Sequence, residues 1–252
     1  MNFTKYQGTG NDFIIIDGRD KLPALDVAHL CHRRFGIGAD GLMILEPSSD
    51  FDFKMVYYNS DGKISSMCGN GGRCIAHFAS GLGLGKHLHF MAIDGPHKAL
   101  VQQDHVSLEM GDVSKIKRIN NSTFELNTGS PHYVIFHKTP IDSFDLIPFA
   151  KSVRFSALYE KEGININVAF ENEGVLDVRT YERGVEDETY SCGTGVTAAA
   201  LAHFSKNRQM GKNNIEIETL GGILNVEATY QSDSFTDIIL SGPATPVFSG
   251  KI

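Results

Sequence analysis

The stretch Cys68-Gly69-Asn70-Gly71-Gly72-Arg73-Cys74 has a counterpart, Cys192-Gly193-Thr194-Gly195, nearly half the chain later. In both places a strand-like run ends in tyrosine and a polar residue, Asn59 or Glu182. A glycine-bearing loop follows, and Cys-Gly-x-Gly comes after nearly the same interval. Repetition of such a unit indicates that the chain consists of two halves with one design. This duplication is the strongest indication of the fold in the sequence.

A helix is expected after each of these cysteines. Cys74, Phe78 and Leu82 recur at the spacing of a helix face, as do Val196, Ala200 and Phe204. Each of the two leading cysteines therefore lies at a helix N-terminus. Free backbone N–H groups and the positive end of the helix dipole lower a thiol pKa there and attract an anion. A single cysteine of this kind is usually only a cap, whereas two matched copies favour a shared function.

Short β-branched or alternating runs outnumber helical segments. Helices separated by several strands predict an α+β fold rather than a doubly wound sheet. Helical periodicity is expected over 26–34, after Cys68, around 146–153 and after Cys192. The expected strands are Phe13–Ile16, Leu42–Leu45, Phe53–Tyr58, Val106–Met110, Tyr133–Phe136, Ile164–Phe170, Leu176–Tyr181, Ile215–Thr219, Ile223–Ala228 and Ile238–Leu240.

Composition narrows the possible partners. The 23 Lys and Arg against 30 Asp and Glu give a net charge of -7, and the longest basic cluster is Arg33-Arg34, so no nucleic-acid partner is expected. No apolar run approaches the roughly 20 residues that cross a bilayer, and no secretory signal is recognisable. We therefore expect a cytoplasmic protein that binds no membrane and keeps its four cysteines reduced. Cys31 and Cys74 fall on apolar helix faces and are expected in the core.

Two facing halves would direct two helix N-termini, each with a thiol, at one small carboxylate. The α-carbon of that ligand would lie between two sulfur atoms on opposite sides. One thiolate would remove a proton and the other thiol would return one, while backbone dipoles stabilise the developing carbanion. The sequence thus indicates racemisation or epimerisation of an amino acid.

Further motifs strengthen this interpretation: Gly8-Thr9-Gly10-Asn11-Asp12-Phe13, Gly36-Ile37-Gly38-Ala39-Asp40-Gly41, Asn59-Ser60-Asp61-Gly62, Tyr181-Glu182-Arg183-Gly184 and Ser241-Gly242-Pro243-Ala244. Together with the two cysteine motifs they resemble the diaminopimelate epimerase family, in family order along nearly the whole chain. The resemblance implies cofactor-independent epimerisation of LL-2,6-diaminopimelate to the meso form, in lysine and peptidoglycan precursor synthesis. It implies two pseudo-symmetric halves, each a mostly antiparallel or mixed sheet wrapped around a central helix, with the active site in the cleft between them.

The resemblance also implies domain bounds and an assembly. The N-terminal half is expected to comprise 1–117, joined by the C-terminal segment 241–252, and the C-terminal half 118–240. A homodimer is implied, to which Pro246-Val247-Phe248 contribute. No cofactor and no metal ion are implied.

The resemblance assigns the site residues one by one. Cys68 and Cys192 would be the two bases. The N–H groups of Gly69, Asn70, Gly193 and Thr194 would hold the reacting carboxylate. The side chains implied to bind the remaining amino and carboxylate groups are Asn11, Asn59, Asn167, Glu182 and Arg183. A guanidinium suits a distal carboxylate, and a carboxylate suits an ammonium group. His132 is a further candidate, which would tune a cysteine or orient a loop.

Three positions depart from the family pattern. Ser130 stands where asparagine is common, so a shorter hydroxyl replaces an amide that would contact the substrate. Gly41 stands where some members carry glutamine. The loop of residues 185–188 is one residue longer than in many relatives.

Three other functions account for parts of the sequence pattern less well. A proline or hydroxyproline racemase of the same architecture would act on a substrate without a distal charged group, which Arg183, Asn59 and Asn167 argue against. A thiol redox or metal protein is disfavoured because Cys68 and Cys74 lack a structural zinc spacing and no C-x-x-C is present. A binding module without catalysis would not need both cysteines.

Overall fold

The computed structural model describes residues 1–65 and 67–252, which divide into two compact units. Unit 1 comprises Met1–Leu108 and Gly242–Ile252, and unit 2 comprises Glu109–Ser241. The C-terminal segment therefore belongs to the same unit as the N-terminus. From the sequence we expected a domain boundary between residues 117 and 118. That boundary stays a prediction.

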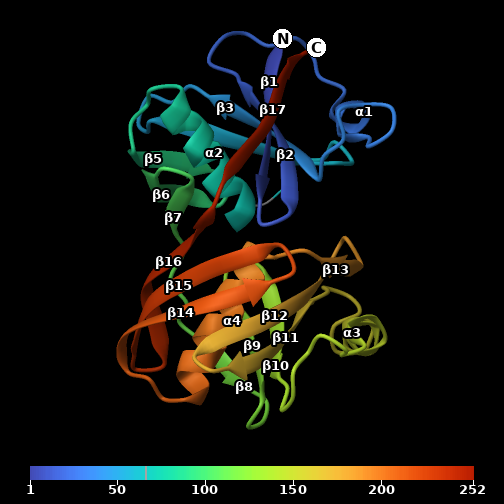
Figure 1. Cartoon of the computed structure of the whole chain (residues 1–252), viewed down its shortest axis with the longest axis vertical. Coiled ribbons are helices and arrows are strands. Elements are labelled where there is room, and N and C mark those ends of the chain that lie inside the picture. Colours follow the sequence, from blue (N-terminus) through green and yellow to red (C-terminus); the bar gives the residue numbers. More distant parts are fainter. Residues whose placement is uncertain (66) are drawn as a thin grey trace. The chain divides into compact units, whose positions relative to one another are not determined.

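Unit 1 is a mixed sheet whose strands follow the order β17-β1-β2-β3-β4-β5-β6-β7. Only the pairs β2 with β3 and β4 with β5 are parallel, and the other neighbours are antiparallel. The last strand of the chain lies beside the first, as Figure 1 shows in red and blue. The strands are β1 (Asn2–Gly8), β2 (Asn11–Asp17), β3 (Gly41–Glu46), β4 (Phe53–Asn59), β5 (His87–Ala92), β6 (Gly95–Gln102), β7 (His105–Glu109) and β17 (Thr245–Lys251).

Unit 2 repeats this order as β8-β9-β10-β11-β12-β14-β15-β16. Its parallel pairs, β10 with β11 and β12 with β14, occupy the same two places as those of unit 1. The position-by-position agreement confirms the duplication inferred from the two cysteine motifs. The strands are β8 (Ile116–Arg118), β9 (Thr123–Asn127), β10 (Pro131–Phe136), β11 (Asn165–Asn172), β12 (Val175–Glu182), β14 (Gly211–Thr219), β15 (Gly222–Gln231) and β16 (Ser234–Pro243), and β13 (Asp187–Thr189) pairs with β12 as an addition.

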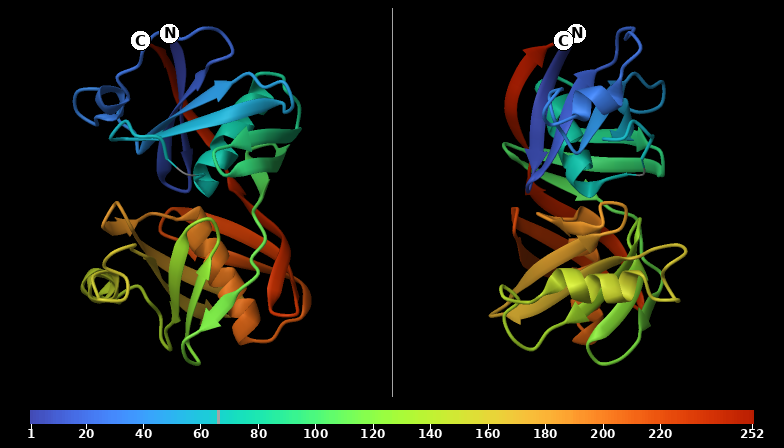
Figure 2. Two further views of the ribbon diagram at one scale, coloured as in Figure 1. Left: turned by 180° about the vertical axis from the view of Figure 1, so that it is seen from behind. Right: turned by 90° about the vertical axis from the view of Figure 1, so that its right-hand side faces the viewer.

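Each unit has one long and one short helix at equivalent points. The long helices α2 (Gly69–Gly81) and α4 (Gly193–Lys206) pack against several strands of their own units, which curve around them in Figure 2. The short helix α1 (Val27–Cys31) joins β2 to β3, and α3 (Leu146–Arg154) joins the equivalent strands β10 and β11. The expected α+β fold of two pseudo-symmetric halves, each with a sheet around a central helix, is confirmed.

Both faces of the central strands are covered, which explains their continuous apolar sequence. All four residues 13–16 of β2 are fully buried. Ile14 and Ile16 share an apolar cluster with Val27 and Cys31 of α1, so successive side chains in the strand turn toward opposite layers. In unit 2 the strand β11 makes the equivalent cluster with α3. The long helix of each repeat comes after equivalent strands in the chain: α2 follows β4, and α4 follows β12 and the additional strand β13.

The four predicted helices are all present, and one is shorter than expected. The expected helix over 26–34 ends at Cys31, because His32 takes an extended backbone conformation. Cys31 and Cys74 are buried, as expected of core residues. Along the part of the chain that the structure describes, no helix combines the length and apolar character needed to cross a membrane.

Candidate active site

The two long helices begin in the same way. Cys68 is the N-cap of α2 with φ −115° and ψ 120°, and Cys192 is the N-cap of α4 with φ −123° and ψ 113°. The first helical hydrogen bonds run from Gly72 N–H to the Cys68 carbonyl at 2.7 Å and from Val196 N–H to the Cys192 carbonyl at 2.9 Å. The N–H groups of the two residues after each cysteine precede these bonds. They supply the partial positive charge of a helix start beside each sulfur.

Cys68 lies between a donor and an acceptor. Gly71 N–H donates to the Cys68 sulfur at 3.5 Å, and the Cys68 thiol donates to Asn11 Oδ1 at 3.5 Å. The Asn11 amide is oriented by its own donation to Asp40 Oδ2 at 2.6 Å. The thiol form and the thiolate form of Cys68 therefore each have a partner.

A set of paired charges holds Asn11 in place. Asp12, its neighbour, forms ion pairs with Lys5 at 2.8 Å and with Arg33 at 2.8 Å, and Arg33 also pairs with Asp40 at 2.6 Å. Burial alone would raise the pKa of Asp12, but hydrogen bonds and charge from Arg33 and Lys5 hold that pKa well below its usual range. The Asp12 carboxylate thus stays ionised, and Arg33, which pairs with both Asp12 and Asp40, keeps the acceptor of the Asn11 amide in place.

Cys192 is the end of a chain of hydrogen bonds. Its sulfur lies 3.4 Å from Thr194 Oγ1, which lies 2.9 Å from His132 Nε2. His132 Nδ1 lies 3.1 Å from Asn167 Nδ2, and Thr180 Oγ1 donates to Asn167 Oδ1 at 2.9 Å. The structure therefore brings together three of the predicted site residues around Cys192: His132, Asn167 and Thr194.

The direction of this chain follows from Asn167. Its Nδ2 also donates to the Tyr133 carbonyl at 3.2 Å, so the amide cannot be reversed without losing bonds on both sides. His132 Nδ1 is then an acceptor, and the proton of the neutral ring is on Nε2. Burial lowers the pKa of His132 to about 3, with a further contribution from the charge of Arg183, so the ring stays neutral. His132 donates to Thr194 Oγ1, whose own proton is directed toward the Cys192 sulfur.

Glu182 is the last residue of β12, and Arg183 follows it. Glu182 accepts a hydrogen bond from Thr189 Oγ1 at 2.6 Å. The exposed Arg183 side chain donates to the Glu162 carbonyl at 2.9 Å and to Ser130 Oγ at 3.5 Å. Ser130, which departs from the family pattern, thus contacts the cation that we expect to bind the distal carboxylate.

Asn59 ends β4, as Glu182 ends the equivalent strand β12. It is exposed, and its N–H donates to the Lys63 carbonyl at 2.9 Å. It pairs in register with Gly41 of β3, the other departure from the family pattern. A Cβ on Gly41 would lie 2.4 Å from the Tyr57 ring, so the packing here excludes a side chain. The binding roles of all the predicted residues stay predictions.

Several supporting residues were missed in the sequence. Asn165 donates to Ser130 Oγ at 2.9 Å and accepts the Arg183 N–H at 2.8 Å, which joins β11 to the loop after β12. The alternation of Asn165 and Asn167 on one face of a strand could have identified it. Asp40, Thr180 and Thr189 carry no comparable signal, because the strand pairing or the loop that brings each beside its partner is not visible in the sequence pattern.

The second glycine of each motif packs against a strand. A Cβ on Gly71 would lie 2.2 Å from Met43 Cε of β3, and one on Gly195 would lie 2.4 Å from Asn167 Oδ1 of β11. These strands are equivalent in the two repeats. The glycines therefore allow close contact between helix start and strand, in addition to any approach by a ligand.

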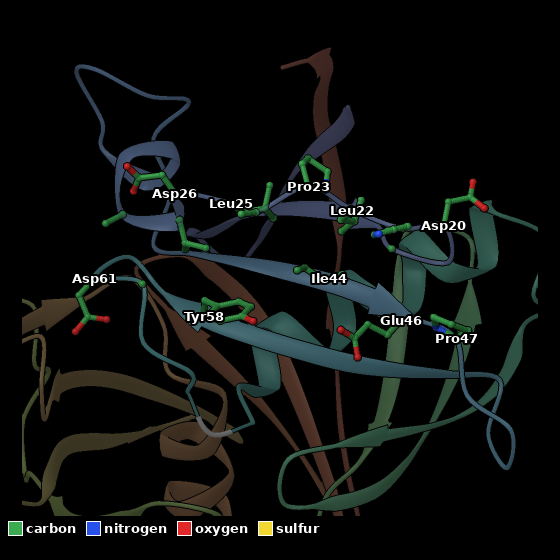
Figure 3. A pocket seen from close by; sticks show the side chains of 16 residues that line it. Asp20, Leu22, Pro23, Leu25, Asp26, Ile44, Glu46, Pro47, Tyr58 and Asp61 are labelled. Carbon is green, nitrogen blue, oxygen red and sulfur yellow. The ribbon is translucent and has the colours of Figure 1, made fainter.

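A cavity of about 830 Å³ lies elsewhere on unit 1, between residues 18–28 and strands β3 and β4 (Figure 3). Asp20, Asp26, Glu46 and Asp61 line it, and neither leading cysteine does. This cavity is therefore not the place where Cys68 or Cys192 would react with a substrate. Within residues 1–65 and 67–252, no three His, Cys, Asp or Glu side chains are grouped so as to hold a metal ion.

The chain is similar to known proteins over its whole length. The family profile described as diaminopimelate epimerase matches residues 3–116 and 124–246. A protein of Flavobacterium psychrophilum named diaminopimelate epimerase is 48% identical, with 100% of both chains covered. A protein of the same name from Archaeoglobus fulgidus is 34% identical, covering 98% of this chain and 95% of its own.

Solved structures with the same fold are more distant in sequence. A Bacillus anthracis phenazine biosynthesis protein of the PhzF family matches with a TM-score of 0.77 and 15% identity, covering 100% of this chain and 98% of its own. An Agrobacterium vitis hydroxyproline epimerase, solved with bound trans-4-hydroxy-L-proline, gives a TM-score of 0.70 and 14% identity, covering 99% and 91%. At these identities the likeness concerns the fold alone.

Proposed function

The chain belongs to the diaminopimelate epimerase family, and we propose that it is an isomerase which converts LL-2,6-diaminopimelate to meso-diaminopimelate without a cofactor. The observation that carries the proposal is the pair of cysteine-capped helix starts within a chain that matches its curated relatives over its whole length. The reaction would supply lysine and peptidoglycan precursors, which would place the enzyme in the cytoplasm.

The proposed mechanism uses one proton from each side of the substrate. In one direction a thiolate at Cys68 or Cys192 takes the α-proton, and the bond electrons remain on carbon. The thiol of the other cysteine then donates its proton to the opposite face of that carbon. Each turnover leaves the two sulfur atoms with exchanged protonation states, so the reverse reaction uses them in the opposite roles.

The backbone N–H groups of Gly69, Asn70, Gly193 and Thr194 would bind the reacting carboxylate and the charge that develops next to it. Oriented N–H dipoles stabilise such charge without reorganising. The side chains that would hold the other polar groups of the substrate are Asn11, Asn59, Asn167, Glu182 and Arg183. Because His132 is neutral and bonded to Thr194, it would orient that residue rather than carry a proton itself.

The deciding experiment incubates the purified chain with LL-diaminopimelate in D₂O. We expect meso product with one α-deuterium, while the recovered LL substrate stays protiated early in the reaction, because the incoming proton comes from the second cysteine. The variants Cys68→Ala and Cys192→Ala are the matched controls, and neither should form product. Deuterium that appears first in the substrate would contradict the two-base mechanism.

The same assay with L-proline and trans-4-hydroxy-L-proline tests the alternative, since a structure of the same fold binds the latter. We expect no turnover of either, because Arg183 and Glu182 suit a second charged end. Turnover of proline without turnover of diaminopimelate would overturn the proposed substrate.

We also propose a homodimer. Val247 and Phe248 of β17 are about half exposed, at 56% and 50%, on the edge strand of unit 1. An exposed apolar edge strand favours pairing with another chain. Sedimentation equilibrium of the wild type and of Phe248→Lys tests this, and a wild-type monomer at micromolar concentration would refute it.

A further inference from the structure

Arg73, in the second turn of α2, is fully buried. Its Nη1 donates to the Gly69 carbonyl at 3.4 Å and its Nη2 to Thr9 Oγ1 at 3.3 Å, while Nε has no hydrogen-bond partner among the described residues. Burial lowers the pKa of the Arg73 guanidinium to about 10, which still leaves it charged at neutral pH. Burying a cation with so few partners costs folding free energy, and a nearby negative charge would offset that cost.

The equivalent position of the other repeat carries no charge. Thr197 follows Cys192 by the same number of residues as Arg73 follows Cys68, and its Oγ1 donates to the Gly193 carbonyl at 2.9 Å. Both side chains therefore contact the carbonyl of the residue just after the leading cysteine. A hydroxyl meets this geometric requirement in unit 2, so the charge of Arg73 is not needed to cap the carbonyl in unit 1.

No carboxylate forms an ion pair with Arg73 in the part of the chain that the structure describes. The ionisable groups whose charge would act on Arg73 are two thiols, Cys74 and Cys68. Cys74 is fully buried, and burial raises its pKa to about 12, so it stays a thiol. Cys68, only half-buried at the helix start, is the remaining group that can carry a negative charge.

The other ionisable groups on the elements packed against α2 are accounted for. The strands concerned are β1, β2, β3, β6 and β17. Burial raises the pKa of Tyr6 to about 12, and its hydroxyl is bonded to His77 on α2 itself, so it stays neutral. Charged side chains on these strands are paired or exposed: Lys5 with Asp12, Asp17 with Arg19, Glu46 with Lys54, His97 with Asp94, and Lys98 and Lys251 at the surface.

We propose that Arg73 is a positioning residue whose buried charge holds Cys68 in its thiolate form, which gives the two cysteines unequal protonation in the resting enzyme. The inference rests on the proposed function, in which Cys68 is one of two bases. Arg73 lies five positions after Cys68, which corresponds to about 7.5 Å along the helix axis. Its side chain reaches back toward the N-terminus. At about 7 Å and an effective dielectric constant of about 20, a unit charge shifts a thiol midpoint by one to two pH units.

The test is the pH dependence of iodoacetamide labelling of Cys68 and Cys192, measured separately by tandem mass spectrometry on the whole protein without substrate. In the wild type we expect a Cys68 midpoint below the ordinary value of about 8.5. Arg73→Met should raise the Cys68 midpoint by one to two units and slow labelling at pH 7 by about tenfold or more. Arg73→Lys should restore most of the shift, and the matched control Thr197→Val should leave the Cys68 midpoint unchanged.

A merely structural role for Arg73 gives a different result. Replacing a buried, poorly paired charge by methionine should leave the melting temperature unchanged or raise it, so slower Cys68 labelling in an equally stable variant supports the proposal. An unchanged Cys68 midpoint in Arg73→Met, or equal shifts at Cys68 and Cys192, would overturn it. A wild-type Cys68 midpoint at or above 8.5 would overturn it without any variant. Because labelling needs no substrate, these outcomes are independent of whether diaminopimelate is turned over.

Discussion

Replacing Thr194 with valine would remove one hydroxyl from the hydrogen-bond chain that ends at Cys192, with almost no change in side-chain volume. In the structure that hydroxyl accepts from His132 Nε2 at 2.9 Å and lies 3.4 Å from the Cys192 sulfur. A hydrogen bond to a charged group contributes about 1.5–3 kcal/mol. Its loss should raise the thiol midpoint of Cys192 by about one to two pH units and lower kcat by about 10-fold to 150-fold.

The assay compares Thr194→Val with Thr194→Ser, which keeps the hydroxyl. We expect serine to retain most of the wild-type rate, and valine to show the lower kcat and a shifted labelling profile at Cys192 alone. The Cys68 profile is the internal control, because Thr194 belongs to unit 2. A valine variant with the wild-type rate and Cys192 midpoint would refute the argument that the chain stabilises the thiolate.

Three further changes have defined outcomes. Arg183→Lys loses the planar fork that reaches Ser130 and the Glu162 carbonyl, so steady-state kinetics should show an increase in KM for diaminopimelate of about tenfold, with kcat less affected. Asp12→Asn leaves Lys5 buried without its carboxylate and should cost about 3 kcal/mol or more in urea unfolding. Because the folded pKa of Asp12 is depressed, its stabilisation is present above about pH 4 and should be lost as the pH falls below that value. Gly195→Ala meets the fixed amide of β11, whereas Gly71→Ala meets the flexible end of a methionine on β3, so kcat should fall by about tenfold or more only in the first.

Each of these predictions has a contrary result that would count against it. An Arg183→Lys variant that lowers kcat alone would show that the side chain acts in the chemical step. Equal unfolding free energies for the wild type and Asp12→Asn would show that water already screens Lys5. Equal activity of the two glycine variants would mean that the Asn167 amide is free to move.

Local sequence signals predicted the parts of the fold that local interactions determine. The helices after Cys68 and Cys192 were predictable because the cap, the glycines and the apolar spacing all lie within one segment. The strands β1, β5, β6, β8, β9, β13 and β17 were not predicted. β17 contains Pro246 and is largely exposed, and it is a strand because it pairs with β1 at the other end of the chain. Single-segment periodicity carries no information about such a distant partner.

The same distinction applies to the site. The positions of Cys68 and Cys192 at the starts of the two long helices were predictable, since each motif is short and repeated. The donor that reaches Cys192 was not, because the Thr194 hydroxyl receives its direction from Asn167 through His132, across three separate segments. Arg73 belongs to the motif that begins at Cys68, yet only its complete burial in the structure distinguishes it from an ordinary surface arginine.

The placement of β17 has a consequence for how the protein is made. The partner of β1 follows the whole of unit 2 in the sequence, so β1 leaves the ribosome with its hydrogen-bonding edge open until residues 245–251 emerge. Unit 2, a continuous segment, is free to fold earlier. A chain interrupted after residue 243 would therefore carry every described strand of the second repeat and a first repeat in which β1 lacks its partner β17.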